Sequence, residues 1–325
     1  MKNKVTVSAP GKLMLFGEHA VVYGKPCIVT AVDQRIRLTA EKLASNELAV
    51  DAPDVGISGY RKDTGKLGVG MEIPKGVKFI EFTVKNFKNV YGLPGGVKIN
   101  TKSDFSSEFG FGSSSAVTVA VVKALSELFQ TKLSKKALFD LSYKTVIEIQ
   151  GVGSGFDLAA AIWGGTLYFV GGGEVIKPFK TRSLPLVVGY TGIKADTATL
   201  IRQVGELYKS QKAEIEGIFD SIQEIVEAAK IAIEDSNLKK LGELMNANQN
   251  LLAKLGVNSS ELNNLVTAAL ASGALGAKLS GAGGGDCMIA VVGKDKRKDV
   301  AEAIEKAGGQ VIDINTNAEG VKIEK

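Results

Sequence analysis

Apolar and polar positions alternate with a period of two near the start of the chain, which is typical of β-strands. The alternation predicts strands over residues 5–7 and 13–16, with Pro10 and Gly11 forming the turn between them. A longer strand-like stretch follows over residues 28–50. Because these strands succeed one another closely, they indicate an antiparallel sheet.

Helical periodicity appears further along the chain. Residues 116–129 are apolar on most faces and predict a helix buried in the core, and residues 134–150 predict a helix capped by Ser134. Residues 51–75 are rich in glycine and charge without a clear period, and they predict a loop. The same half is expected to contain a helix over 79–91, a strand over 97–100, a helix over 156–163 and a strand over 166–170.

Three consecutive glycines at 171–173 mark a candidate domain boundary. Beyond them the pattern predicts strands at 184–190, 287–292 and 311–314 and helices at 197–209, 213–235, 239–255, 259–271 and 297–307. A chain of 325 residues can form two cores of ordinary size. The sequence therefore predicts an α+β protein with two domains, residues 1–180 and 181–325.

Composition narrows the classes of partner. Its 40 basic residues are interspersed with 35 acidic ones and form no basic block, so nucleic acid is not an expected partner. No apolar run approaches 18 residues and the start of the chain lacks the apolar stretch of a signal peptide, so no membrane association is expected. The only cysteines, Cys27 and Cys287, argue against a disulfide framework and favour the cytoplasm.

Three glycine-rich segments lie far apart but each adjoins core-like sequence: PGKLMLFGEHAVVYG (10–24), FGFGSSSA (109–116) and LSGAGGGDC (279–287). Glycine costs backbone entropy, so this density indicates either tight turns or a bulky anion lying against bare backbone. A lysine, a run of hydroxyls and single acidic residues accompany the glycines. This mixture favours an enzyme that handles phosphate groups.

The second segment has the most explicit chemistry. Gly110 and Gly112 lead into a helix that is predicted to begin within Ser113–Ser115. Unpaired N–H groups and the helix dipole attract phosphate to such a helix start, and serine hydroxyls can bind phosphate or Mg²⁺. An N-cap serine after a tight turn would account for only one glycine and one serine. The segment is neither a Walker A loop nor a dinucleotide-binding fingerprint.

Lys12, His19 and Asp157 are the candidates for the chemistry itself. Asp157 is expected near the start of a helix, where it could favour the positive helix end or accept a proton from an attacking hydroxyl. Lys12 could equally be a surface lysine. His19 is the only histidine, which excludes a zinc site built on a histidine pair, and no G-x-S-x-G elbow indicates a serine hydrolase. The third glycine segment fits a backbone cradle over phosphates better than a structural turn.

Taken together, the three segments resemble the three motifs of the GHMP small-molecule kinases, in the same order and over nearly the whole chain. The similarity extends to residues 187–204 and 241–257. That family combines an N-terminal domain of the ribosomal-protein-S5 type with a ferredoxin-like C-terminal domain, and its active site lies between them. The resemblance implies ATP and Mg²⁺ as cofactors, a small-molecule substrate and a possible homodimer.

The resemblance also implies roles for individual residues. Lys12 and Asp157 match the catalytic lysine and aspartate of the family, and Ser114 matches a Mg²⁺ ligand. The positions that match the ATP phosphate loop are Gly110, Phe111, Gly112, Ser113, Ser114 and Ser115. The positions that match the acceptor pocket and its adjoining loop are Glu18, His19, Gly281, Ala282, Gly283 and Gly284.

Two acceptors stay open, mevalonate and 5-phosphomevalonate. Members that phosphorylate mevalonate usually carry a Mg²⁺-binding glutamate where this chain has Val146, and Glu148 is rotated by roughly 200° around a helix. That absence, with GVGSGFD and GGGDC, favours 5-phosphomevalonate, whose phosphate could be bound by Lys102 or Lys194. The form GEHAVVYG favours mevalonate, which we expect to be the acceptor. A non-catalytic sensor of ATP or a metabolite is disfavoured because Lys12 and Asp157 are both present.

Overall fold

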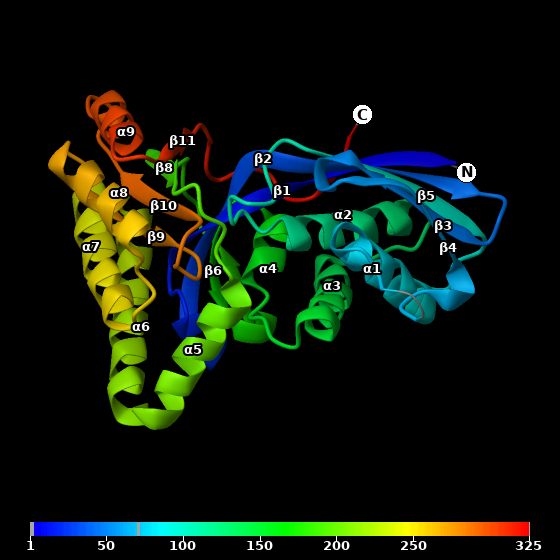
Figure 1. The fold of residues 1–325 in the computed structure, drawn as a ribbon, viewed down its shortest axis with the longest axis horizontal. Coiled ribbons are helices and arrows are strands. Elements are labelled where there is room, and N and C mark those ends of the chain that lie inside the picture. Colours follow the sequence, from blue (N-terminus) through cyan, green and yellow to red (C-terminus); the bar gives the residue numbers. More distant parts are fainter. Residues whose placement is uncertain (1–2, 70–71, 325) are drawn as a thin grey trace.

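Two separate β-sheets organise the protein, whose computed structural model describes residues 3–69 and 72–324. Figure 1 shows the larger sheet along one end of an elongated molecule and the smaller sheet at the other, each covered by helices. Strands and helices follow one another without a regular alternation along the chain. The predicted α+β class is confirmed.

The longest ladder of the larger sheet joins β1 (Lys4–Phe16) to β2 (Pro26–Leu43) in antiparallel fashion. The prediction of a turn at Pro10 and Gly11 is wrong, because β1 continues through both residues with a register shift between them. Proline has no N–H to give to a ladder, and an irregularity in the register accommodates this loss. The next residue, Lys12, donates its backbone N–H to the Phe111 carbonyl at 3.0 Å.

Besides β12 (Lys322–Ile323), the larger sheet has two strands that the apolar pattern did not predict. β4 (Ile57–Asp63) lies within the predicted loop 51–75, of which residues 70 and 71 are outside the described residues, and β7 (Val175–Pro178) follows the glycine run. Both lie at sheet edges and have exposed positions, so their apolar periodicity is weak. The remaining central strands are β3 (Glu47–Ala52), β5 (Gly96–Ser103) and β6 (Thr166–Val170).

Four helices pack on one face of this sheet (Figure 1). They are α1 (Lys75–Tyr91), α2 (Ser113–Leu128), α3 (Lys135–Gln150) and α4 (Phe156–Trp163). α2 contacts β1 and β2 as well as the other three helices, which confirms the predicted burial of this apolar helix. Ser134 caps α3 as predicted, since its hydroxyl accepts the Ala137 N–H at 3.1 Å.

The smaller sheet has the strand order β11–β8–β10–β9. Its strands are β8 (Leu186–Tyr190), β9 (Gly276–Ser280), β10 (Cys287–Val291) and β11 (Gln310–Ile312). β9 was not predicted because its sequence, GAKLS, contains a glycine, a lysine and a serine and continues directly into the third glycine-rich segment, whereas the equally buried β8 and β10 are almost wholly apolar. The helices of this half are α5 (Thr197–Ser210), α6 (Lys212–Glu234), α7 (Leu238–Lys254), α8 (Ser260–Ala271) and α9 (Arg297–Lys306). Within residues 3–69 and 72–324, none of the helices has the length and apolar character needed to cross a membrane.

The end of the chain returns to the larger sheet. β12 (Lys322–Ile323) pairs with β1, and isolated bridges join Thr316 to Val32 and Glu319 to Gly164. The division into residues 1–180 and 181–325 therefore stays a prediction, in which the last residues of the second part lie on the sheet of the first.

Buried Arg35 attaches this returning segment to β2. Its guanidinium donates to the carbonyls of Glu319 and Gly320 at 2.7 and 2.8 Å. It also donates to the hydroxyl and the carbonyl of Ser8 on β1 at 2.7 and 3.0 Å. One side chain thus joins three segments that are distant in the sequence.

We expect Arg35→Met to lower the free energy of unfolding by about 2–4 kcal/mol, because buried acceptors would lose a charged donor. Urea denaturation measures the loss. Arg37→Met is the matched control: Arg37 makes a partly exposed ion pair with Asp104, so its removal should cost less than about 1 kcal/mol. Equal losses in the two variants would contradict the role given to Arg35.

Candidate active site

A cavity of about 230 Å³ lies where the three glycine-rich segments meet. β1, the loop before α2, the turn before α4 and the loop between β9 and β10 all contribute to its wall. Most of the predicted site residues line this cavity. They are Lys12, His19, Gly110, Gly112, Ser113, Ser114, Ser115, Asp157, Gly281 and Ala282.

Lys12 and Asp157 form an ion pair in the cavity wall, with the Nζ and Oδ1 atoms 3.1 Å apart. The Lys12 ammonium also donates to the Gly110 carbonyl at 3.0 Å and lies 5.2 Å from the centre of the Phe156 ring. Only 9% of the lysine side chain is exposed, against 29% for the aspartate. A nearly buried cation and a more accessible carboxylate are therefore available to the same reacting group.

The loop from Gly110 to Ser115 lies against this ion pair. Gly110 and Gly112 have left-handed φ values of 70° and 73°. A Cβ on Gly112 would lie 3.2 Å from Lys12 Cε and 3.3 Å from Asp157 Oδ1, so both conformation and space require glycine there. Gly112 is the N-cap of α2, which begins at Ser113. The free amides of the first helical turn and three serine hydroxyls together make a site suited to phosphate.

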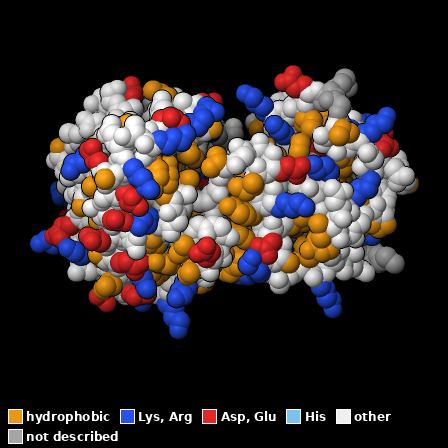
Figure 2. Space-filling model, turned by 90° about the horizontal axis from the view of Figure 1, so that it is seen from below, with side chains coloured by type: hydrophobic (Ala, Val, Ile, Leu, Met, Phe, Trp, Pro, Cys, Tyr) orange, Lys and Arg blue, Asp and Glu red, His pale blue; other side chains and the backbone are white. Residues whose placement is uncertain are grey.

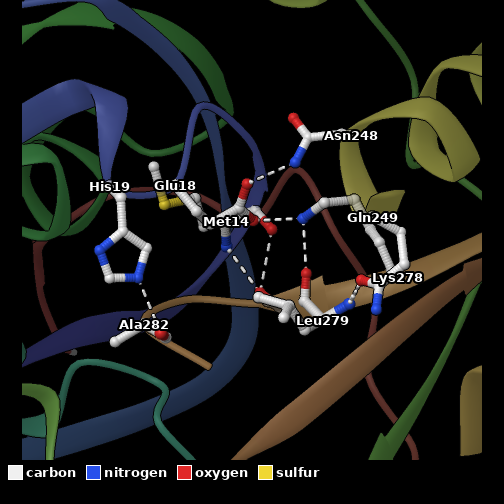
Figure 3. A network of polar contacts seen from close by, with 9 residues as sticks. Met14, Glu18, His19, Asn248, Gln249, Lys278, Leu279 and Ala282 are labelled. Carbon is white, nitrogen blue, oxygen red and sulfur yellow. Dashed lines mark hydrogen bonds and ion pairs between the residues drawn. The ribbon is translucent and has the colours of Figure 1, made fainter. Parts of the chain in front are cut away.

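His19 connects the first glycine-rich segment to the third. Its Nε2 lies 2.8 Å from the Ala282 carbonyl, and its backbone has a left-handed φ of 59° (Figure 3). Burial lowers the pKa of His19, although the bond to Ala282 opposes this shift. The imidazole is therefore expected to be neutral near pH 7, with its Nε2–H donated to that carbonyl.

Four predicted site residues do not line the cavity. The Glu18 carboxylate is buried and paired with Lys278 (Figure 3). Phe111 is buried among aromatic rings next to the phosphate loop. Gly283 and Gly284 pack against the connection between α7 and α8 and against α5, respectively. The roles predicted for these four residues stay predictions.

Asp286 lines the cavity although the sequence analysis gave it no role in the site. Its Oδ1 accepts the Ala195 N–H at 2.9 Å, and a Cβ on Gly110 would lie 2.5 Å from its Oδ2. Burial raises the pKa of Asp286, and nearby lysines oppose the shift. The aspartate in GGGDC was the available signal. Lys194 also lines the wall and donates its Nζ–H to the Ser107 carbonyl.

Val146, which stands where mevalonate-phosphorylating members of the family usually have a Mg²⁺-binding glutamate, also lines the cavity with its apolar side chain. Glu148 lies outside the lining and is paired with Lys85 and hydrogen-bonded to Asn86. Lys102, on β5, is exposed and likewise outside the lining. The charged residues of the described lining are thus two lysines, Lys12 and Lys194, and two aspartates.

On the face of the molecule shown in Figure 2, the described residues form no area in which charge of one sign is concentrated. Figure 2 shows basic and acidic side chains intermixed over one face of the molecule, with apolar side chains gathered mostly toward its middle. The net charge of +5 is therefore dispersed on this face. The charged side chains of the cavity lining are the groups that we consider for binding an anionic ligand.

Comparisons with known proteins agree with this geometry. Residues 78–165 match the N-terminal domain of GHMP kinases, and residues 229–310 match the C-terminal one. The mevalonate kinase of Pyrococcus furiosus is 36% identical over 338 residues, which cover 99% of each chain. The crystal structure of the Methanococcus jannaschii mevalonate kinase aligns with a TM-score of 0.83 at 26% identity, over 97% of this chain and 98% of that one. The crystal structure of the L. major mevalonate kinase in complex with R-mevalonate aligns with a TM-score of 0.79 at 28% identity, over 98% of this chain and 97% of that one.

Because the chain has a single histidine, an NMR titration reports on His19 alone. We expect a midpoint below the ordinary value of 6.5, since burial disfavours the imidazolium. The unfolded chain then binds the proton more readily, so His19 makes the protein less stable as the pH falls below about 6.5 toward the folded-state value. The urea-unfolded protein serves as the reference, with a midpoint near 6.5. A folded-state midpoint above that of the reference would contradict the expectation.

Proposed function

The chain belongs to the GHMP kinase family, and we propose that it transfers the γ-phosphoryl group of ATP to mevalonate, forming 5-phosphomevalonate. The observation that carries this proposal is the Lys12–Asp157 ion pair set against the start of α2 in one cavity. Full-length similarity to the mevalonate kinase of Pyrococcus furiosus supports the choice of acceptor.

Phosphoryl transfer requires positioning and counter-charge more than covalent chemistry. The start of α2 binds the β- and γ-phosphates through its free amides and the hydroxyls of Ser113–Ser115. Lys12 stabilises the charge that develops on the transferred group and on the acceptor oxygen. Asp157, 3.1 Å from Lys12, orients the acceptor hydroxyl and takes its proton. The contacts of Lys12 with Asp157 and with the Gly110 carbonyl hold its ammonium beside the carboxylate. Both groups can therefore reach the same acceptor oxygen.

The residues at the start of α2 fit a Mg²⁺ ion that arrives with ATP. Mg²⁺ prefers oxygen ligands, retains several waters and commonly takes only one or two ligands from the protein besides phosphates. The Ser114 hydroxyl is such an oxygen donor on the cavity wall, and we assign it as the protein ligand. When bound, the ion neutralises charge on the β- and γ-phosphates.

A second cavity, of about 520 Å³, suits the nucleoside of ATP. It shares Ser107, Ser113 and Ser114 with the first cavity, so a nucleotide could extend from one into the other. Its wall includes the apolar side chains of Phe79 and Phe105, which suit the face of a purine ring. The phosphates would then lie at the serines that the two cavities share.

The charges of the first cavity favour mevalonate over 5-phosphomevalonate. Lys12 is paired with Asp157, which leaves Lys194 as the lining cation without a carboxylate partner among the described residues. One such cation suits the single carboxylate of mevalonate, whereas an additional phosphate dianion would require further basic groups. Asp286 adds a negative charge to the wall whenever it is ionised. Apolar side chains of Met14 and Ile201 could contact the methyl branch of mevalonate.

We also propose that the enzyme acts in the cytoplasm, which suits its two buried, unpaired cysteines. A homodimer of the kind expected from the family stays a prediction, and its mass in solution can be measured by light scattering.

Asp157→Asn retains the size of the side chain but removes the base, so turnover should fall by roughly 10²–10⁴-fold while ATP still binds. Steady-state kinetics and calorimetry with ATP measure the two effects separately. Asp140→Asn is the matched control, because Asp140 forms an exposed i,i+4 ion pair on α3. Wild-type turnover by Asp157→Asn would mean that Asp157 only stabilises the start of α4, and the proposed catalytic role would be rejected.

The acceptor is tested by coupled ADP-release assays with mevalonate and 5-phosphomevalonate offered separately. We expect turnover with mevalonate and at most a trace with 5-phosphomevalonate, because the cavity lacks cations for a second anionic group. Lys102→Ala should leave the mevalonate KM unchanged, since Lys102 lies outside the lining. Turnover of 5-phosphomevalonate alone would replace the proposed acceptor, and no ADP release with either compound would reject the kinase assignment.

A further inference from the structure

A buried polar network lies behind the acceptor side of the cavity and has no part in the mechanism above. At its centre the Glu18 carboxylate is paired with the Lys278 ammonium, and both side chains are fully buried. The other Glu18 oxygen accepts a hydrogen bond from Asn248 Nδ2 at 3.4 Å (Figure 3). Removing two charges from water costs free energy that their mutual attraction often does not offset. The position of this buried pair therefore requires an explanation.

One side of the network is the sharp turn of residues 17–19. Gly17 has a φ of 98° and a Cβ there would lie 2.5 Å from the Cβ of Cys27, so the chain turns against β2 without room for a side chain. His19 adopts a left-handed φ of 59°, which is strained for a residue other than glycine. Such a conformation persists only when its surroundings hold it, and Glu18 is the residue between these two.

The other side of the network is β9, at its junction with the third glycine-rich segment. Lys278 donates to the Leu279 carbonyl, and the Leu279 N–H donates to Gln249 Oε1 on α7 at 2.9 Å. The Ser280 hydroxyl accepts the Met14 N–H at 3.0 Å and donates to the Met14 carbonyl at 2.9 Å. β9 is therefore joined to α7 on one side and to β1 on the other, immediately before the loop 281–285 begins.

The two sides meet again at the cavity wall through the bond between His19 and the Ala282 carbonyl. Figure 3 shows this contact beside the Glu18–Lys278 pair, with His19 following directly after Glu18 along the chain. By contrast, within the part of the chain that the structure describes, the hydrogen-bond and ion-pair partners of Glu18 and Lys278 include no residue of the phosphate loop 110–115. The network is thus connected to the acceptor side of the site and separate from the nucleotide side.

We propose that Glu18 and Lys278 are a positioning pair that holds the 17–19 turn against β9 and thereby fixes His19 and the 281–285 loop in the acceptor wall. Neither side chain contacts the acceptor. This inference rests on the proposed function, because it assigns the acceptor to the wall formed by His19 and Ala282. It also changes the expectation for Glu18, which the family resemblance placed in the acceptor pocket itself.

The kinetic test compares Glu18→Gln, Lys278→Met and the double variant. We expect each single change to raise the acceptor KM about tenfold or more, the double variant to raise it no further, and the KM for ATP to stay within about twofold of wild type. The double variant removes both charges and leaves no unpaired buried charge, so its kinetics can be measured even if a single variant fails to fold. A rise with Glu18→Gln but none with Lys278→Met would mean that Glu18 touches the acceptor directly and would overturn the proposal.

The matched control is the double variant Lys62→Met, Glu81→Gln. This pair has the same chemistry and a fully buried carboxylate, but it joins β4 to α1 far from His19 in the chain and outside the lining of the first cavity. Its removal should lower the melting temperature without changing the acceptor KM. An equal rise in acceptor KM in this control would show that general destabilisation explains the effect, and the positioning role would be rejected.

A second readout does not depend on activity. The NMR signals of the single histidine should shift in the Glu18→Gln, Lys278→Met double variant, with a titration midpoint closer to 6.5, and should stay unchanged in the control pair. A folded double variant with wild-type His19 signals and a wild-type acceptor KM would refute the proposal. If the wild-type protein does not phosphorylate mevalonate, the proposed function fails while the histidine signals still decide whether the pair positions His19.

Discussion

The near-complete burial of the Lys12 ammonium is the constraint on which the site depends. An ammonium withdrawn from water needs a counter-charge and hydrogen-bond acceptors, and Asp157 and the Gly110 carbonyl provide them. Those partners come from two different helix starts, so α2 and α4 must begin at the same place beside β1. Gly112 suits this convergence because its φ of 73° is left-handed and a Cβ there would lie only 3.2 Å from Lys12 Cε and 3.3 Å from Asp157 Oδ1. The start of α2 and the Asp157 carboxylate are therefore brought together by the requirements of a single lysine.

Much of this arrangement could be predicted because it is encoded locally. Two glycines before three serines indicate a phosphate-binding helix start whatever the rest of the chain does, and the apolar character of residues 116–129 indicates that this helix is central. The β1 irregularity could not be distinguished from a turn, since Pro10 and Gly11 favour both. β9 was not predicted because its five residues include a glycine, a lysine and a serine and adjoin a glycine-rich segment, so they lack the apolar run that identified β8 and β10.

Long-range polar contacts were beyond the reach of sequence patterns. Nothing near Glu18 in the chain indicates that its partner is Lys278, because the pairing depends on how β9 is placed next to β1. The same holds for Asp286, whose orientation depends on the Ala195 amide in a different loop. The family resemblance identified which residues gather around the site, whereas only the fold distinguishes those that line the cavity from those that lie behind it.

The return of the chain end to β1 has a consequence for biosynthesis. Arg35 and its strand leave the ribosome early, but the carbonyls of Glu319 and Gly320 that bind its guanidinium are made more than 280 residues later. Until residues 319–323 leave the ribosome, the larger sheet lacks a pairing for one edge of β1, and a buried cation lacks two of its acceptors. The larger sheet is therefore completed only after residues 319–323 have been made, and a nascent chain stalled before them holds an unfinished sheet.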